Sequence, residues 1–276
     1  MNTWILISPK QLLANGSNLK FQFLILLFSA TFLRAESVWQ SQTSKHFEIF
    51  VSTGKLGGAL IAGLEDMRSK LQVHVAPFAP WFHKEKIKIY IYPDEAAYLN
   101  GQFHPPQWSL GIAIAKSRTV AVYQQSDTRK FKTIVLHEIT HLLFQDYFEE
   151  KPPRWLTEGY AMLMEQDALL TLKSLKDSSL IAKSKNKPPL TVIPLGRFFQ
   201  ETPDRDTPES RTGVWYQQAK SLVQYLYRSR QANAFKELCE HLKKGAPLTE
   251  ALKSVYGFES VPALEQAWLF YLKTLP

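Results

Sequence analysis

The stretch TRKFKTIVLHEITHLLFQDYF, residues 128–148, carries two histidines and a glutamate inside a segment that is otherwise largely apolar. Its apolar residues recur at three- and four-residue intervals, which predicts one long helix with Ser126 and Asp127 at its N-cap. Because apolar side chains surround most of this helix, we expect it to be buried. Two histidines in a buried helix are costly unless they have a ligand or polar partners.

The pentapeptide HEITH places His137 and His141 one above the other on the same helix face. Two neutral imidazoles in this arrangement can bind one zinc ion. Glu138 lies near the open side of such a site, where a carboxylate can act as general base toward water. The alternative is a surface helix with two solvated histidines, and the apolar surroundings argue against it.

A catalytic zinc site needs a third protein ligand and a free fourth position. The next segment, PPRWLTEGYAMLMEQDALL, predicts a second helix and places Glu158 17 residues after His141. Gly159 follows, and its missing side chain would allow two helices to approach closely. Four other acidic residues could also serve as the third ligand, but they are better explained as solvated charges: Asp146, Glu149, Glu150 and Glu165. For Glu165, seven residues after Glu158, orienting a histidine is the alternative to surface exposure.

The chain before the first helix predicts a sheet. HFEIFVS (46–52) and KIKIYIY (86–92) alternate as strands do, with Ile87, Ile89 and Ile91 on one face of the second. SLGIAIAK and TVAVYQQ follow as two short strands, separated by a Ser-Arg pair. They predict a hairpin or an edge pair of strands.

From residue 127 onward the predicted elements are helical, apart from a polar, proline-containing excursion at 173–212. A mixed sheet followed by helices is typical of an α+β fold. We therefore predict one domain over 36–276, with a mainly β-sheet part at 36–126 and a helical part at 127–276. The long excursion is a candidate lid, because loops of this length are usually functional or mobile.

The first 35 residues differ from the rest of the chain. They contain three basic residues and no acidic ones, and FQFLILLFSATFL (21–33) is too short to span a bilayer. This pattern predicts a signal peptide over 1–35, cleaved after Ala35, and export to the periplasm or beyond. A buried N-terminal helix and an uncleaved membrane anchor are the alternatives.

Composition limits the other functional classes. Of 33 basic and 25 acidic residues, three basic ones lie in the first 35, so the remainder carries a formal charge of +5. The charges form no long block of one sign, which argues against a nucleic-acid partner. This mild excess is compatible with peripheral association with an anionic cell envelope. A single cysteine, Cys239, allows no intramolecular disulfide, and the oligomeric state cannot be predicted.

HEITH followed by PRWLTEGYA resembles the gluzincin group of zinc metallopeptidases, especially its peptidase MA-like branch. The WLxEGxA segment is also similar to that of aminopeptidase-N-type enzymes. YQQAKSLVQYL, which begins at Tyr216, resembles a later helix where the family places a catalytic tyrosine. The resemblance covers roughly residues 86–272. It implies a zincin-like fold and an enzyme that hydrolyses peptide bonds.

Carried over to this sequence, the resemblance implies one zinc ion bound by His137, His141 and Glu158, with Glu138 as general base. It also implies that Tyr216 donates a hydrogen bond to the oxyanion formed during peptide hydrolysis. The alternative for Tyr216 is a core aromatic residue.

One departure from the aminopeptidase-N pattern concerns the substrate. The GxMEN-like segment that holds a free amino group is absent, so we expect endopeptidase-like activity on peptides or proteins. In zincins this region supplies an edge strand that pairs with extended peptide, and residues 119–124 are the candidate here. The alternatives are a catalytically inactive zincin-fold module that binds peptide or envelope, and a zinc-stabilised structural domain. Structural zinc sites are usually rich in cysteine, which disfavours the latter.

Overall fold

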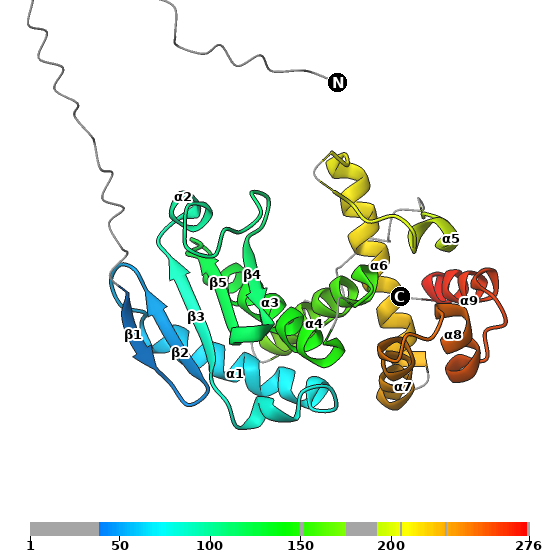
Figure 1. Ribbon diagram of the computed structural model, residues 1–276, viewed down its shortest axis with the longest axis horizontal. Helices are drawn as coiled ribbons and strands as arrows, with labels where there is room; N and C mark the ends of the chain where they lie inside the picture. Colours follow the sequence, from blue (N-terminus) through cyan, green and yellow to red (C-terminus); the bar gives the residue numbers. More distant parts are fainter. Residues whose placement is uncertain (1–38, 150–151, 175–191, 205, 230, 275–276) are drawn as a thin grey trace, which may run out of the picture. The chain divides into compact units, whose positions relative to one another are not determined.

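The computed structural model describes residues 39–149, 152–174, 192–204, 206–229 and 231–274. Ser37–Pro276 form one compact unit, and the predicted signal peptide lies outside the described residues. Within this unit a mixed sheet precedes a series of helices, so the predicted α+β class is confirmed (Figure 1). The predicted division at residues 126 and 127 falls in the loop between the last strand and the HEITH helix.

Five strands form the sheet, in the order β1-β2-β3-β5-β4. The two central pairs, β2 with β3 and β3 with β5, are parallel, whereas β1 and β4 are antiparallel to their neighbours. The predicted hairpin of β4 and β5 is confirmed, and Arg118 in its turn has a φ of 50°. The strands are β1 (Gln40–Thr43), β2 (Phe47–Val51), β3 (Ile87–Tyr92), β4 (Gly111–Ile114) and β5 (Thr119–Tyr123).

The alternation in β3 decides which face of the sheet forms the main core. Ile87, Ile89 and Ile91 are fully buried, and they belong to the same apolar cluster as helices α1 (Gly58–Val75) and α3 (Thr128–Phe148). The opposite face carries a smaller aromatic cluster, to which α2 (Glu95–Leu99) contributes Tyr98. The sequence patterns missed β1 and α2, which have only four and five residues.

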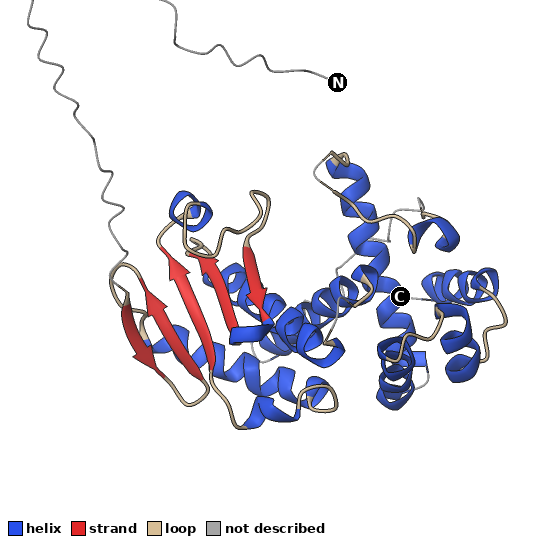
Figure 2. Ribbon diagram, in the orientation of Figure 1, coloured by secondary structure: helices blue, strands red, loops and turns tan. Residues whose placement is uncertain are grey.

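The remaining helices follow the sheet in sequence (Figures 1 and 2). Asp127 caps α3 as predicted, because its carboxylate accepts a hydrogen bond from the Arg129 backbone N–H at 2.7 Å. At the other end Glu149 adopts a left-handed conformation, with a φ of 59°, which stops the helix. The later helices are α4 (Arg154–Ser174), α5 (Leu195–Phe198), α6 (Glu209–Ser229), α7 (Gln231–Lys243), α8 (Leu248–Tyr256) and α9 (Val261–Thr274).

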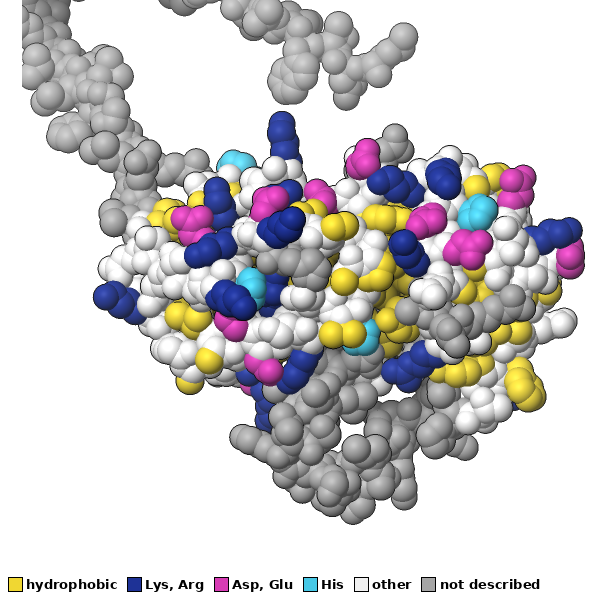
Figure 3. All heavy atoms as spheres, turned by 90° about the horizontal axis from the view of Figure 1, so that it is seen from below, with side chains coloured by type: hydrophobic (Ala, Val, Ile, Leu, Met, Phe, Trp, Pro, Cys, Tyr) yellow, Lys and Arg dark blue, Asp and Glu magenta, His cyan; other side chains and the backbone are white. Residues whose placement is uncertain are grey.

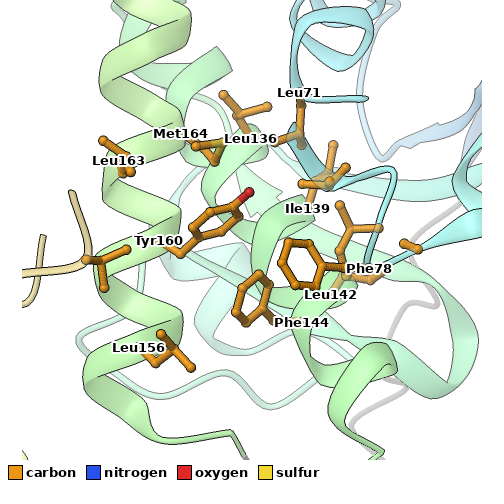
Figure 4. Close-up of a cluster of buried hydrophobic side chains, with 14 of the residues drawn as sticks. Leu71, Phe78, Leu136, Ile139, Leu142, Phe144, Leu156, Tyr160, Leu163 and Met164 are labelled. Carbon is orange, nitrogen blue, oxygen red and sulfur yellow. The ribbon is translucent and has the colours of Figure 1, made fainter. Parts of the chain in front are cut away.

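The HEITH helix and α4 share a buried interface that fixes their relative position. Figure 4 shows α3 side chains facing Tyr160 and other side chains of α4, with Leu71 of α1 on the far side. Phe144 and Tyr160 have ring centroids 4.8 Å apart, and Phe78 completes the group. Because side chains of this size pack at the density of a crystal, the polar residues on the same two helices are held in a defined register.

The predicted excursion at 173–212 is shorter than expected at both ends. Helix α4 continues to Ser174, and α6 begins at Glu209 rather than near Val214. Residues 175–191 lie outside the described residues, so the idea of a lid stays a prediction. The described part, 192–204, is held against α6, because Gln218 makes hydrogen bonds to the Ile193 backbone N–H (2.8 Å) and carbonyl (2.7 Å).

Across the described ranges, every helix is too short or too polar to cross a bilayer. On the face drawn in Figure 3, lysine and arginine side chains are interspersed with acidic ones rather than gathered in one area. This face therefore shows no broad basic surface of the kind that binds a nucleic-acid backbone.

Candidate metal centre and active site

The two histidines of HEITH lie next to each other, as their spacing predicts. His137 Nε2 and His141 Nε2 are 2.9 Å apart, with ring centroids at 4.5 Å. Both are on the part of α3 that packs between the sheet and α4, and both side chains are mostly buried. The local sequence explains this placement, because the helix is apolar on its other sides.

Helix α4 brings Glu158 to the same point. Its Oε2 atom lies 3.5 Å from His137 Nε2 and 3.4 Å from His141 Nε2. Each of the three residues offers a ligand atom within 4.8 Å of the other two, which is compatible with a single metal ion. The structure thus brings together the three predicted ligands from two helices.

The outer nitrogen of each imidazole has a partner on α4. His137 Nδ1 contacts the Glu165 carboxylate, and His141 Nδ1 lies 2.9 Å from Thr157 Oγ1. For Glu165 the preferred prediction, a solvated surface charge, is wrong, and the alternative role of orienting a histidine is what the contact shows. Glu158 and Glu165 are seven residues apart and share a helix face. Thr157 was missed, and its position beside Glu158 in WLTEG was the available signal.

The chemistry of these donors fits a zinc ion. A carboxylate can only accept, so Glu165 holds the proton of a neutral His137 on Nδ1 and leaves a lone pair on Nε2. When Thr157 accepts in the same way from His141 Nδ1, two lone pairs and a carboxylate oxygen face one another, an arrangement that a proton or a metal ion between them stabilises. Two ligands at zinc distances in a tetrahedral site are about 3.4 Å apart, close to both distances from Glu158 Oε2.

The electrostatics agree with this description of the site. Burial lowers the pKa of His137, but the carboxylates of Glu158 and Glu165 outweigh burial and raise it. Glu158 behaves oppositely: burial raises its pKa, and both imidazoles together bring it well below the usual range. In the absence of metal, a proton therefore occupies the place that a divalent cation would take.

Glu138 is buried between this centre and the sheet. A Cβ atom built on Gly111 of β4 would lie 2.8 Å from Glu138 Cγ and 3.1 Å from its Oε1. The Glu138 carboxylate thus packs closely against the backbone of Gly111, which has no side chain. Burial raises its pKa, with the carboxylates of Glu158 and Glu165 acting in the same direction against the two histidines.

The predicted edge strand at residues 119–124 is wrong. Strand β5, Thr119–Tyr123, has β3 on one side and β4 on the other, so both of its sides are paired. The edge on this side of the sheet is β4, whose Gly111–Ile114 backbone pairs only with β5 among the described strands. After β3 the chain first forms the edge strand β4 and then returns to form β5 between β3 and β4. Strand order of this kind cannot be predicted from alternation alone.

Tyr216 packs as a core aromatic residue, and its role as an oxyanion donor stays a prediction. Its ring packs edge-on against Trp215, with centroids 5.2 Å apart, and joins the border of the main core. Its hydroxyl accepts a hydrogen bond from Arg154 Nη2 at 3.0 Å. Burial and the nearby Glu158 carboxylate raise the pKa of Tyr216, so the phenol keeps its proton at neutral pH.

Gly159 sets the distance between α4 and α6, the helix that carries Tyr216. A Cβ atom at Gly159 would lie 2.4 Å from the Ala219 carbonyl oxygen and 2.6 Å from Val223 Cγ2. The close helix approach expected at Gly159 exists, and its partner is α6. This contact places the helix bearing Glu158 directly against the helix bearing Tyr216.

Two of the rival carboxylates have other partners. The indole N–H of Trp81 donates to Asp146, and Glu149 pairs with Lys243 at 2.7 Å. Glu150 lies outside the described residues. Neither Asp146 nor Glu149 belongs to the group of possible metal ligands found among the described residues.

Comparison with known proteins gives one family. A sequence model of the peptidase MA superfamily matches residues 74–274, which include most of the sheet and all of the site described above. A comparison with curated proteins found no significant match. The similarity to aminopeptidase-N-type enzymes in particular stays a prediction.

Proposed function

The chain belongs to the peptidase MA superfamily, and on that premise we propose that it is a zinc-dependent metallopeptidase with endopeptidase-like activity. The family supports a metal-dependent peptidase in general. Zinc is our choice of metal because two histidines and a glutamate are a donor set that catalytic zinc sites use. The observation that carries the proposal is the convergence of His137 Nε2, His141 Nε2 and Glu158 Oε2 within 4.8 Å.

The bound metal would act as a Lewis acid toward water and the peptide carbonyl. Glu138 would accept a proton from the attacking water and return it to the leaving amine. Its position suits both transfers, because Glu138 is next to His137 in sequence and its side chain packs against Gly111 of β4.

Tyr216 would stabilise the negative oxygen that forms on the substrate carbonyl. A protonated phenol can donate a hydrogen bond there, and donors of this kind contribute strongly in a site that excludes water. The Tyr216 oxygen already accepts a hydrogen bond from Arg154, so the Tyr216 O–H does not point toward Arg154. The hydroxyl proton is therefore available for the substrate.

Strand β4 would bind the substrate backbone. It is one of the two edge strands of the described sheet, and its Gly111 lies against Glu138. An extended peptide can add to an exposed strand edge through main-chain hydrogen bonds, which need no free terminus. Binding along β4 would bring a peptide bond to Glu138 and is the basis for proposing an endopeptidase.

A direct test compares three proteins on an unstructured protein substrate. We expect the zinc-loaded wild type to cleave it and chelator-treated protein to lose that activity. Glu138→Gln should still bind zinc but lose about 10²- to 10⁴-fold in rate, the usual contribution of a general base. Peptide binding without cleavage by the zinc-loaded wild type would instead indicate an inactive zincin-fold module.

We also propose that residues 1–35 direct export and are then removed. The support is the sequence pattern at 21–33, a short apolar run behind Lys20. N-terminal sequencing of protein recovered from the expressing cells and their medium tests this. A mature chain that begins at Glu36 is the expected result. A chain that retains residues 1–35 in the membrane fraction would indicate an uncleaved anchor.

A further inference from the structure

Arg154 lies one helical turn before Glu158 and touches three parts of the structure. Its Nη2 donates to the Tyr216 hydroxyl at 3.0 Å, and its Nη1 donates to the Pro203 carbonyl at 3.0 Å. Its Nε lies 3.5 Å from Glu158 Oε1. The guanidinium thus links a candidate metal ligand, the candidate oxyanion donor and the segment before α6.

The two oxygens of Glu158 have different partners. Oε2 is the atom that faces both histidines, whereas Oε1 is the atom that faces Arg154. A carboxylate held in this way presents one oxygen to a metal and is restrained from rotating by the other. The interaction with Arg154 therefore favours a single-oxygen ligand.

The contact with Arg154 also determines the direction of the Tyr216 O–H bond. Arginine has only donors, so the Tyr216 oxygen must be the acceptor in their hydrogen bond. The phenol proton then points away from Arg154 and is free for another acceptor. A glutamine or a water in place of Arg154 could accept that proton and turn the hydroxyl away from the substrate.

Resting on the proposed function, we propose that Arg154 is a positioning residue that orients the Tyr216 hydroxyl as a hydrogen-bond donor. It acts through Tyr216 rather than on the substrate. The Pro203 carbonyl supports this role, because it belongs to a segment anchored on α6. The Trp215 indole N–H of α6 donates to the Glu201 carbonyl of that segment at 2.9 Å.

A double-mutant cycle on kcat tests the coupling between Arg154 and Tyr216. The zinc-loaded variants are Arg154→Gln, Tyr216→Phe and their combination, with Arg211→Gln as a control. Arg211 lies on α6, as Tyr216 does, but it pairs with Glu201 at 2.6 Å. Arg154→Lys is measured as well, because lysine keeps the charge and one donor but not the fork of the guanidinium.

If Arg154 positions Tyr216, both single variants lower kcat by about ten- to a hundredfold with little change in KM. The kcat of the double variant is then at most about threefold lower than that of Tyr216→Phe, since the two residues act as a unit. Arg154→Lys recovers part of the loss, and Arg211→Gln stays near wild type. Losses that multiply in the double variant would overturn the proposal.

A second readout needs no activity. In protein labelled with carbon-13 in its tyrosine rings, the Tyr216 signal is identified by its absence from Tyr216→Phe. We expect this signal to shift in Arg154→Gln, with and without zinc, and to stay in place in Arg211→Gln. An unchanged Tyr216 signal in Arg154→Gln would overturn the proposal even if the enzyme is active. A wild type that cleaves nothing refutes the proposed function, while this spectrum still decides whether Arg154 holds Tyr216.

Discussion

Replacing Gly111 by alanine should move Glu138, the proposed general base, without touching a proposed metal ligand. The added Cβ would lie 2.8 Å from Glu138 Cγ, 2.9 Å from Val122 Cγ1 and 3.1 Å from Glu138 Oε1. Carbon atoms in contact are normally about 3.5–4.0 Å apart, so both carbon neighbours are about 0.6–0.7 Å too close. Movement of Glu138 alone does not relieve the contact with Val122, which is fully buried in the core. We therefore expect β4 to shift as well, and Glu138 to be displaced relative to the metal ligands.

The size of the effect follows from that displacement. A catalytic group misplaced by about 1 Å can cost about 10²-fold in rate, so we expect Gly111→Ala to lower kcat by about ten- to a hundredfold. Overpacking of this kind also costs about 1–3 kcal/mol of folding free energy. Zinc affinity should change little, because His137, His141 and Glu158 are on the helices rather than on β4.

The assay measures kcat and KM on an unstructured protein substrate, together with zinc content and denaturant unfolding. Gly58→Ala is the matched control, because a Cβ atom there meets nothing within 4 Å. Wild-type kcat in Gly111→Ala, with zinc bound and the protein folded, would show that the general base does not lie against β4. Loss of zinc in this variant would point to a different arrangement of the site.

Three further predictions concern the helix pair and the metal. Gly159→Ala should destabilise the fold by about 1–3 kcal/mol, measured by denaturant unfolding, because its Cβ would meet the Ala219 carbonyl oxygen at 2.4 Å; unchanged stability would contradict this contact. Glu165→Gln should weaken zinc binding by about 10- to 100-fold in a chelator competition, since Glu165 orients His137; wild-type affinity would contradict that role. The raised pKa of His137 means that zinc displaces a proton at neutral pH. Apparent zinc affinity should therefore fall about tenfold for each unit that the pH drops below neutrality, and a flat profile in the same competition at pH 6 and 7 would count against it.

The helical part of the site could be predicted because short-range rules determine it. Residues four apart on a helix share a face, so the spacing of the sequence alone is enough to place His137 beside His141. Glu158 could be predicted because a catalytic zinc needs a third ligand, and because the segment after HEITH is long enough to turn the chain and bring a second helix alongside. The hydrogen-bond partner of His141, Thr157, was missed because no rule of spacing requires a threonine there.

The edge strand was predicted wrongly for a physical reason. Alternation identifies strands but carries no information on which strand pairs with which neighbour. Strands β4 and β5 have similar compositions, and the later one lies inside the sheet. Short elements such as α2 were missed because five residues do not establish a period. The part played by Arg154 also depends on tertiary contacts, since Tyr216 and Pro203 are far from it in sequence.

Anomalous diffraction at the zinc absorption edge, on crystals of the zinc-loaded protein, locates the metal ion directly. We expect one zinc ion per chain, about 2.0–2.2 Å from His137 Nε2, His141 Nε2 and a carboxylate oxygen of Glu158. A zinc ion bound elsewhere, or a Glu158 carboxylate directed away from the two histidines, would contradict it.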